Sequence, residues 1–335
     1  MKTTFAQSHR LCVAPMMEWT DRHCRFFHRL LSPHARLYTE MVTTGALIHG
    51  DVDRHLRFHE TEHPVALQLG GSEPADLALC AKRAAQYGYD EINLNCGCPS
   101  ERVQRGAFGA CLMAEPLLVR DCVQAMADAV DIPVTVKHRI GIDKTESYEF
   151  VRDFVGTVAQ GGAQTFIVHA RNAWLKGLSP KENREVPPLR YEFARQLKRD
   201  FPALTIVVNG GLTQTHEIGE QLQSVDGVMI GREAYHHPYM LAIWEAEFFG
   251  ADALPSRANV VEKMARYIEN EQAKHGTHLR SVVRHMLGLY NGLPGARRFR
   301  QILSDARLLR DANFNLLLRA LDEIERRVEC PNVDG

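Results

Sequence analysis

Eight short apolar runs recur along the chain, separated by segments long enough for a helix and two loops. They begin near residues 11, 35, 64, 91, 133, 165, 205 and 227. Seven of them end on a polar side chain, and the first ends on Met16 and Met17; the polar ends are Glu40, Gln68, Asn95, Lys137, His169, Asn209 and Arg232. Buried parallel strands are typically continuous Val, Ile and Leu runs, so the pattern predicts an α/β fold, a (β/α)8 TIM barrel. The polar ends should meet at the carboxyl-terminal mouth of the barrel.

The segments between the runs have the apolar spacing of helices. We expect helices over 20–31, with Thr20 as the cap, and over 74–87, 116–130, 146–161 and 189–200. Two loops, over 96–113 and 171–188, are longer than a barrel needs, and long loops on this face often carry function. After Gly250 a short linker precedes four expected helices, over 258–274, 278–290, 295–310 and 313–328. The sequence thus predicts a barrel domain over residues 1–250 and a small helical domain over residues 255–330.

Composition narrows the class of protein. A barrel of this kind takes roughly 250 residues, which leaves the end of this 335-residue chain for another role. No apolar stretch approaches the ~20 residues of a membrane span, and residues 1–10 lack the apolar segment of a secretory signal. We therefore expect a cytoplasmic protein with no membrane partner, whose eight cysteines are free thiols. Nothing in the composition indicates a stable protein partner.

The net charge of −1 conceals a basic segment near the carboxyl end. Between Lys274 and Arg310 there are eight Lys and Arg residues and one acid, Asp305, a local balance of +7. A solvated helix face is the ordinary alternative, but such faces usually interleave acids with bases. The segment therefore favours an anionic partner.

Two possible metal motifs are set aside. His59-Glu60-Thr61-Glu62-His63 matches the HExxH zinc signature, but Pro64 disfavours helical geometry at His63. Cys96 and Cys98 lack a second Cys or His pair at zinc spacing. No metal site is predicted.

The segment Asn95-Cys96-Gly97-Cys98-Pro99-Ser100 is more specific. Gly97 and Pro99 indicate a sharp turn directly after a strand, which would hold the Cys98 thiol over the mouth. A free cysteine on its own is more often a packed core residue. Its place in a turn at a strand end makes Cys98 a candidate acid or nucleophile.

The last two strands end on glycine. Asn209-Gly210-Gly211 and Gly231-Arg232 lie where many barrels bind phosphate through backbone N–H groups, and Arg232 would add a charged partner. Lys137 is costly to bury without an electron-rich partner. His169 alone is compatible with an ordinary core histidine. Together with Gln68 and Asn95, these residues predict a ring of polar groups around a flat, phosphorylated ligand.

Several of these segments, taken together, resemble the tRNA-dihydrouridine synthases. The resemblance rests on Val13-Ala14-Pro15-Met16, Trp19-Thr20-Asp21-Arg22, residues 95–100, Lys137-His138-Arg139, Val168-His169-Ala170-Arg171, Asn209-Gly210-Gly211 and Gly231-Arg232. It runs in order from about residue 10 to residue 240 and extends into the helical tail. The Trp-Thr-Asp-Arg-His-Cys-Arg form and the Lys181-Glu182-Asn183-Arg184-Glu185 loop resemble the A subfamily, which acts on positions 20 and 20a of the tRNA D-loop.

The resemblance implies an FMN-dependent, NADPH-linked reductase that saturates the C5–C6 bond of uridine in tRNA. It places FMN against Pro15, Met16, Met17, Gln68, Lys137, His169, Asn209, Gly210, Gly211, Gly231 and Arg232, and it makes Cys98 the proton donor. Hydride addition at C6 requires an acid at C5, so Cys98 must remain a thiol. The polar edge of uracil suits Asn95, Lys137 and Arg184. We expect tRNA to contact Asn95, Lys137 and Arg184, and also Asn183, Arg297, Arg298 and Arg300.

Two other functions fit part of the sequence. An FMN barrel that reduces a free pyrimidine, like dihydroorotate or dihydropyrimidine dehydrogenases, explains the mouth but leaves the basic tail unused. A non-enzymatic RNA-binding protein with a vestigial barrel explains the tail but leaves Cys98 and Lys137 without a role.

Overall fold

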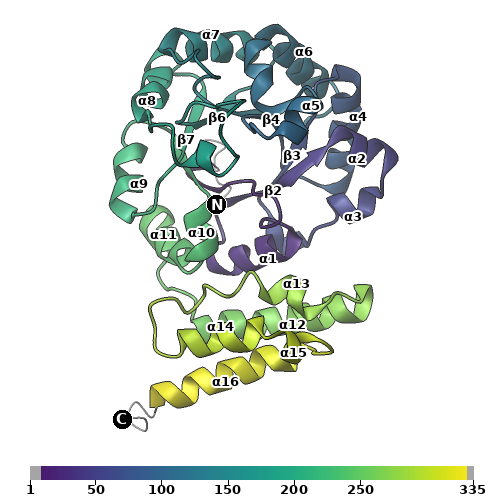
Figure 1. Cartoon of the computed structure of the whole chain (residues 1–335), viewed down its shortest axis with the longest axis vertical. Coiled ribbons are helices and arrows are strands. Elements are labelled where there is room, and N and C mark those ends of the chain that lie inside the picture. The colour runs from purple at the N-terminus through teal and green to yellow at the C-terminus, as the bar shows by residue number, and fades with distance from the viewer. Residues whose placement is uncertain (1–8, 330–335) are drawn as a thin grey trace. The chain divides into compact units, whose positions relative to one another are not determined.

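Eight parallel strands close into a barrel in sequence order, as the apolar runs predicted (Figure 1). The computed structural model describes residues 9–329. The strands are β1 (Leu11–Val13), β2 (Arg36–Thr43), β3 (Val65–Gly70), β4 (Glu91–Cys96), β5 (Val134–His138), β6 (Thr165–His169), β7 (Thr205–Asn209) and β8 (Gly227–Ile230). Each strand begins within two residues of its predicted start. Contacts divide the described residues into two compact units, residues 9–20 with 35–231 and residues 21–34 with 232–329.

In the first unit, helices form the outer layer of the barrel (Figure 1). They are α2 (Thr44–His49), α3 (Val52–Leu56), α4 (Pro74–Tyr87), α5 (Glu101–Arg105), α6 (Pro116–Ala127), α7 (Tyr148–Ala159), α8 (Tyr191–Asp200) and α9 (Thr215–Leu222). Short 3-10 helices cover Glu60–Glu62, Gly109–Ala114 and Glu182–Arg184. Pro74 and Pro116 stand in the first turns of α4 and α6, as predicted. Gly88 ends α4 at φ 88°, where glycine is favoured.

The barrel interior combines a small apolar core with polar layers. Cys12, Ala14, Tyr38, Ala66, Ile167, Val207 and Met229 form one buried cluster. Successive side chains of a strand point to opposite faces, so the residues two positions further along β3, β6 and β7 are Gln68, His169 and Asn209. The apolar cluster therefore lies one layer below the polar strand ends.

Strand β2 is longer than its sequence pattern suggested. It continues past Glu40 to Thr43, and its register against β3 shifts between Tyr38 and Met41. Such an irregularity bends the strand and redirects a side chain. Glu40 here accepts a hydrogen bond from the backbone of Glu18, so it holds the loop after β1.

The second unit is helical. It contains α1 (Arg22–Leu31), α10 (Arg232–His236), α11 (Met240–Phe249), α12 (Arg257–His275), α13 (Leu279–Val283), α14 (Ala296–Ser304), α15 (Ala306–Leu309) and α16 (Asn315–Glu329). It differs from the predicted segment over 255–330 by also including α1, α10 and α11, because α1 packs against α11, α12 and α13.

Three local predictions in this unit were wrong. Asp21 rather than Thr20 caps α1, because its Oδ1 accepts from the backbone N–H groups of His23 and Cys24. The helix expected over 278–290 ends at Val283, and turns follow it. The helix expected over 295–310 is interrupted at Asp305, whose side chain caps α15.

No helix within residues 9–329 is both long and apolar enough to cross a membrane.

Candidate active site

The carboxyl ends of the strands bring several predicted site residues into direct contact. Lys137 of β5 donates from Nζ to Asn209 Oδ1 of β7 at 3.0 Å. Asn95 of β4 donates from Nδ2 to Gln68 Oε1 of β3 at 2.9 Å. The polar strand ends therefore do share one mouth, as their sequence pattern predicted.

The turn after β4 is built around the Asn95 side chain. Asn95 Oδ1 accepts from the backbone N–H of Gly97 at 3.1 Å and from that of Cys98 at 3.0 Å. The half-buried Cys98 thiol lies 3.5 Å from Ser100 Oγ, and the Cys98 carbonyl accepts from Ala110 N–H at 2.9 Å. The backbone around Cys98 is therefore held on both sides, which orients the thiol.

Arg139 ties this turn to the loop after β6. The buried guanidinium donates to the carbonyl oxygens of Gly97 at 3.2 Å, Asn172 at 3.1 Å and Asn183 at 2.8 Å. Burial, with the charges of Arg184 and Arg171, lowers the pKa of Arg139 to about 9. Arg139 is part of the Lys137-His138-Arg139 motif, but the sequence pattern predicted no separate role for it. A second basic residue two positions after Lys137, on the same face of the strand end, was the available signal.

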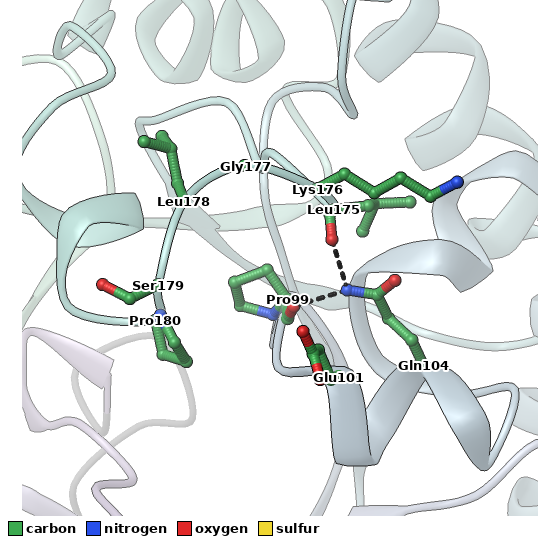
Figure 2. Close-up of a pocket in the computed structure, with 9 residues that line it drawn as sticks. All are labelled: Pro99, Glu101, Gln104, Leu175, Lys176, Gly177, Leu178, Ser179 and Pro180. Carbon is green, nitrogen blue, oxygen red and sulfur yellow. Dashed lines mark hydrogen bonds between the residues drawn. The ribbon is translucent and has the colours of Figure 1, made fainter.

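Gln104 makes a second link between the two long loops. Its Nε2 donates to Pro99 O at 2.7 Å and to Leu175 O at 2.8 Å (Figure 2). The cavity beside it has a volume of about 990 Å³ and is lined by Pro99, Glu101, Gln104 and residues 175–180. Figure 2 shows that its walls come from α5 and from the loop after β6. The two long loops predicted from the sequence therefore line an open hollow that includes Pro99, the residue after Cys98.

Positive charge is concentrated among the site residues. Burial, then the Arg139 charge, lowers the pKa of Lys137 to about 7, although Cys98 opposes this change. Burial, with the charges of Arg139, Lys137, Arg171 and Arg184, holds the pKa of His169 well below its usual value. Basic side chains whose pKa is lowered by burial and by one another's charge indicate a site for an anionic or electron-rich ligand.

Lys137 should make the stability of the ligand-free protein depend on pH. Its pKa is about 7 in the folded state and 10.5 by reference, so the unfolded chain binds the extra proton between these values. The free energy of unfolding should therefore rise with pH across this window, by up to about 1.4 kcal/mol per pH unit. Urea titrations at pH 7 and pH 9 should show a smaller rise for Lys137→Met than for the parent. Equal rises in the two proteins would contradict the prediction.

The glycines after β7 and β8 differ in their surroundings. Gly210 and Gly211 have φ of 124° and 68°, which favour glycine. A Cβ on Gly210 would lie 3.0 Å from His169 Cδ2, so the imidazole packs on this backbone. A Cβ on Gly231 would meet only Ala14 Cβ and Met16 Sδ at 3.6 Å. Gly231 is thus not required by local packing, and its small size leaves room for a ligand.

The loop after β1 contains Pro15, Met16 and Met17. The Thr20 hydroxyl accepts from Met16 N–H at 2.9 Å, and Met16 packs against the apolar cluster of the barrel. The Met17 side chain is 57% exposed. Arg232, the first residue of α10, belongs to the second unit.

The Asn183 side chain is engaged within its own loop. Its side chain is fully buried, its Oδ1 accepts from Trp174 N–H at 2.7 Å, and its Nδ2 donates to Trp174 O at 2.9 Å and Leu178 O at 3.1 Å. The amide is used within the loop, so its role is to shape that loop. The neighbouring Arg184 is exposed, and its charge acts on both Arg139 and His169.

The three arginines of α14 also differ from one another. Arg298 forms an ion pair with Glu323 of α16, with 2.6 Å between Nε and Oε2, so it stabilises the helical unit. Arg297 and Arg300 are exposed and three residues apart, on one side of the helix. The expected contact with tRNA is therefore best tested at Arg297 and Arg300, whose side chains are the more exposed.

The HExxH-like segment has the geometry that Pro64 predicted. Residues 60–62 form a 3-10 turn, and His63 is extended, with φ −60° and ψ 140°. His59 bonds to Thr61 and His63 to Asp90. No cluster of three metal-ligating side chains occurs in the part of the chain that the structure describes.

A model of the family described as "Dihydrouridine synthase (Dus)" matches residues 12–325. The chain belongs to this family. The match covers both compact units, so the helical unit is part of the family's architecture and not an unrelated addition.

Similar proteins of this family are named tRNA-dihydrouridine(20/20a) synthase. The one from Pseudomonas aeruginosa is 62% identical over 300 residues, which cover 89% of this chain and 90% of that protein. Those from Vibrio vulnificus and Escherichia coli are 57% and 58% identical over 96% of this chain, and they are covered over 99% and 93% of their lengths. Among solved structures, a 2-naphthoyl-CoA reductase complex superposes with a TM-score of 0.54 at 11% identity, over 71% of this chain and 50% of that one. That likeness reaches only the fold, and the chain spans half the length of that protein.

Proposed function

We propose that this protein is a tRNA-dihydrouridine synthase of the A subfamily that acts on positions 20 and 20a of the D-loop. The observation that carries the proposal is a thiol on a fixed turn, Cys98, beside a mouth whose other strand ends supply Lys137, His169 and two glycine turns. Relatives with 57–62% identity over nearly the whole chain have names that specify this reaction and these positions. An FMN barrel that reduces a free pyrimidine would have a similar barrel mouth, but it would not belong to the dihydrouridine synthase family.

The donor set at the mouth fits FMN. The pyrimidine edge of a reduced flavin is electron-rich, and the Lys137 amino group at the mouth would be a suitable partner for it. Gln68 uses one Nε2 hydrogen on Asn93 and retains the other for a ligand. Gly211 and Gly231 provide backbone N–H groups that a phosphate can approach, and Arg232 follows directly in the chain. Pro15, Met16, Met17, His169, Asn209 and Gly210 complete the proposed FMN site.

Bound FMN, re-reduced by NADPH, would supply the hydride that adds to C6 of the uracil ring. Negative charge then develops across C5 and O4, and a proton must reach C5. Cys98 is the proposed donor, because its thiol is half-buried on the turn that Asn95 and Arg139 hold. Its proton comes from the thiol form, so the site must favour a neutral Cys98 in the complex.

The uracil edge offers two carbonyl acceptors and one N–H donor. Arg184 and Lys137 are donors on the loop after β6 and at the end of β5, and Asn95 has one amide hydrogen beyond that given to Gln68. A uridine in folded tRNA must leave its stack to reach them, at a cost of a few kcal/mol. We propose that contacts from the helical unit to the tRNA backbone offset that cost and that the enzyme works in the cytoplasm.

The proposal is tested with purified, FMN-loaded protein, NADPH and two substrates. Dihydrouridine should form in an unmodified tRNA transcript at positions 20 and 20a, as mapped by mass spectrometry, but not from free uridine. Turnover of a free pyrimidine at a comparable kcat/KM would favour the rival reductase. A protein that binds tRNA without any turnover would favour the RNA-binding alternative.

The Arg297→Ala, Arg300→Ala double variant should raise the KM for tRNA. Each phosphate contact that is lost should reduce the salt slope of tRNA binding by about one, so the log–log slope should fall by about two. The matched control is Arg54→Ala, Lys82→Ala, which removes two exposed positive charges from the first unit. NADPH oxidation with an artificial acceptor should stay at the parent rate in both variants. Parental binding by the arginine variant at every salt concentration would contradict the prediction.

A further inference from the structure

A continuous chain of buried side-chain hydrogen bonds connects the amino-terminal end of the barrel with the Cys98 turn. It runs from Glu91 to Thr135 (2.6 Å), then to Asn93 (2.8 Å), Gln68 (2.8 Å) and Asn95 (2.9 Å). Asn95 in turn accepts from the backbone N–H groups of Gly97 and Cys98. All five side chains of this chain, which we call the polar relay, are at most 8% exposed.

At the Glu91 end of the polar relay, the hydrogen bonds can run in only one direction, from donor side chains toward the carboxylate. An ionised carboxylate can only accept, and Glu91 accepts from Thr135, from Tyr38 at 2.7 Å and from His9 at 2.7 Å. Burial alone would raise the pKa of Glu91, but His9, Arg36 and the hydrogen bonds outweigh it and lower the pKa to about 2. Thr135 has one hydroxyl hydrogen and gives it to Glu91, so it must accept from Asn93 Nδ2.

The Asn95 end of the polar relay requires the same direction of hydrogen bonding, for an independent reason. The backbone N–H groups of Gly97 and Cys98 can only donate, so Asn95 must present its oxygen to them and its nitrogen to Gln68. Gln68 then accepts through Oε1 and donates through Nε2 to Asn93 Oδ1. The two ends agree, and reversing any one amide would leave a buried donor facing a donor or an acceptor facing an acceptor.

We propose that Glu91, acting through Thr135 and Asn93, is a positioning residue for the Cys98 turn. The carboxylate at the far end of the barrel stabilises the same amide orientations of Gln68 and Asn95 that the turn requires, and Asn95 holds the backbone that bears the thiol. The catalytic part of this inference rests on the proposed function, but the control of the turn by Glu91 does not.

The sequence contains the signal for this arrangement. Glu91, Asn93 and Asn95 alternate with Ile92 and Leu94 along β4, so three polar side chains share the inner face of a strand whose other residues are apolar. Thr135 and Lys137 repeat the pattern on β5, and Ala66 and Gln68 flank it on β3.

Thr135→Val is the first test, because it keeps the shape of the side chain and removes the hydroxyl group. Hydrogen exchange of ligand-free protein, resolved at the Gly97 and Cys98 amides by mass spectrometry, should accelerate about tenfold. Thr135→Ser restores the hydroxyl and should exchange as the parent does. Amides of β6 and β7 should be unchanged in both variants, whereas a merely structural role would accelerate exchange in all strands alike.

Activity provides a second readout. In the loaded enzyme, Thr135→Val should lower kcat for dihydrouridine formation at least tenfold with little change in the KM for tRNA, and Thr135→Ser should recover kcat. Altered exchange without any dihydrouridine activity in the parent would overturn the proposed function but leave the positioning role in place. Parental exchange at Gly97 and Cys98 in Thr135→Val would overturn the positioning role itself.

A variant at position 93 tests the polar relay and does not depend on Thr135→Val folding. Asn93→Leu removes both the donor to Thr135 and the acceptor for Gln68, so it should accelerate exchange at the Gly97 and Cys98 amides about as much as Thr135→Val does. Exchange at the parent rate in Asn93→Leu would overturn the proposal.

Discussion

Cys98→Ala should lower the rate of dihydrouridine formation by about 10²- to 10⁴-fold, the range typical of a lost general acid, while NADPH still bleaches the flavin at the parent rate. Hydride transfer into the flavin needs no thiol, so the variant separates the two half-reactions. The turn should survive the substitution, because Asn95 holds the backbone N–H of residue 98 and not its side chain. Stopped-flow absorbance measures the reductive half-reaction, and mass spectrometry of the tRNA measures the product.

The matched control for this variant is Cys111→Ala. Cys111 is also half-buried, lies in the loop between β4 and α6, and bonds to the Phe108 carbonyl rather than to the Cys98 turn. It should form product at the parent rate. Product formation at the parent rate by Cys98→Ala would show that another group donates the proton.

Gly231→Asp should yield a protein that is purified without flavin. A carboxylate beside a phosphate adds repulsion of the order of 3 kcal/mol, which corresponds to a rise of about a hundredfold in the Kd for FMN. Gly231 suits this test better than Gly211, because a side chain at Gly211 would also meet Leu189 at 2.6 Å and force an unfavourable φ. Absorbance near the flavin bands and titration with FMN measure the effect.

Gly231→Asn is the matched control, since it has the size of Asp without the charge. It should bind FMN more weakly than the parent, through loss of space, but clearly more tightly than Gly231→Asp. If the Asp and Asn variants bind FMN equally well, the phosphate does not lie at the Gly231 turn.

The barrel and the position of its mouth could be predicted from the sequence alone. Buried parallel strands require continuous apolar runs, so the strand starts could be predicted to within two residues, and the polar residue at the end of seven of the eight runs indicated the mouth. Local chemistry was also sufficient to predict that helices begin at Pro74 and Pro116 and that Pro64 prevents a helix over the HExxH-like segment. These features depend on a residue and its near neighbours in the chain.

Helix ends and partners across the fold required the tertiary structure. Asp21 and Thr20 are both good caps, and the choice between them followed from the bond that Thr20 makes to Met16. The basic segment was visible in the sequence, but only the packing of α14 on α16 separated Arg298, which is paired with Glu323, from the exposed Arg297 and Arg300. Arginine can serve an ion pair or a phosphate, and spacing along the chain does not distinguish the two.

Inside the barrel, too, the sequence does not show which partner a polar side chain will have. Asn95 and Asn183 were both assigned to the substrate, because an amide can read a base, but an amide can equally well hold a backbone. Folding commits the Asn183 amide to Trp174 and Leu178, and it commits the Asn95 oxygen to the Cys98 turn, which leaves only one Asn95 amide hydrogen for the proposed uracil contact. Arg139, Gln104 and the polar relay join residues up to 71 positions apart in sequence. Their partners are chosen by the closure of the barrel, which sets distances that no local pattern contains.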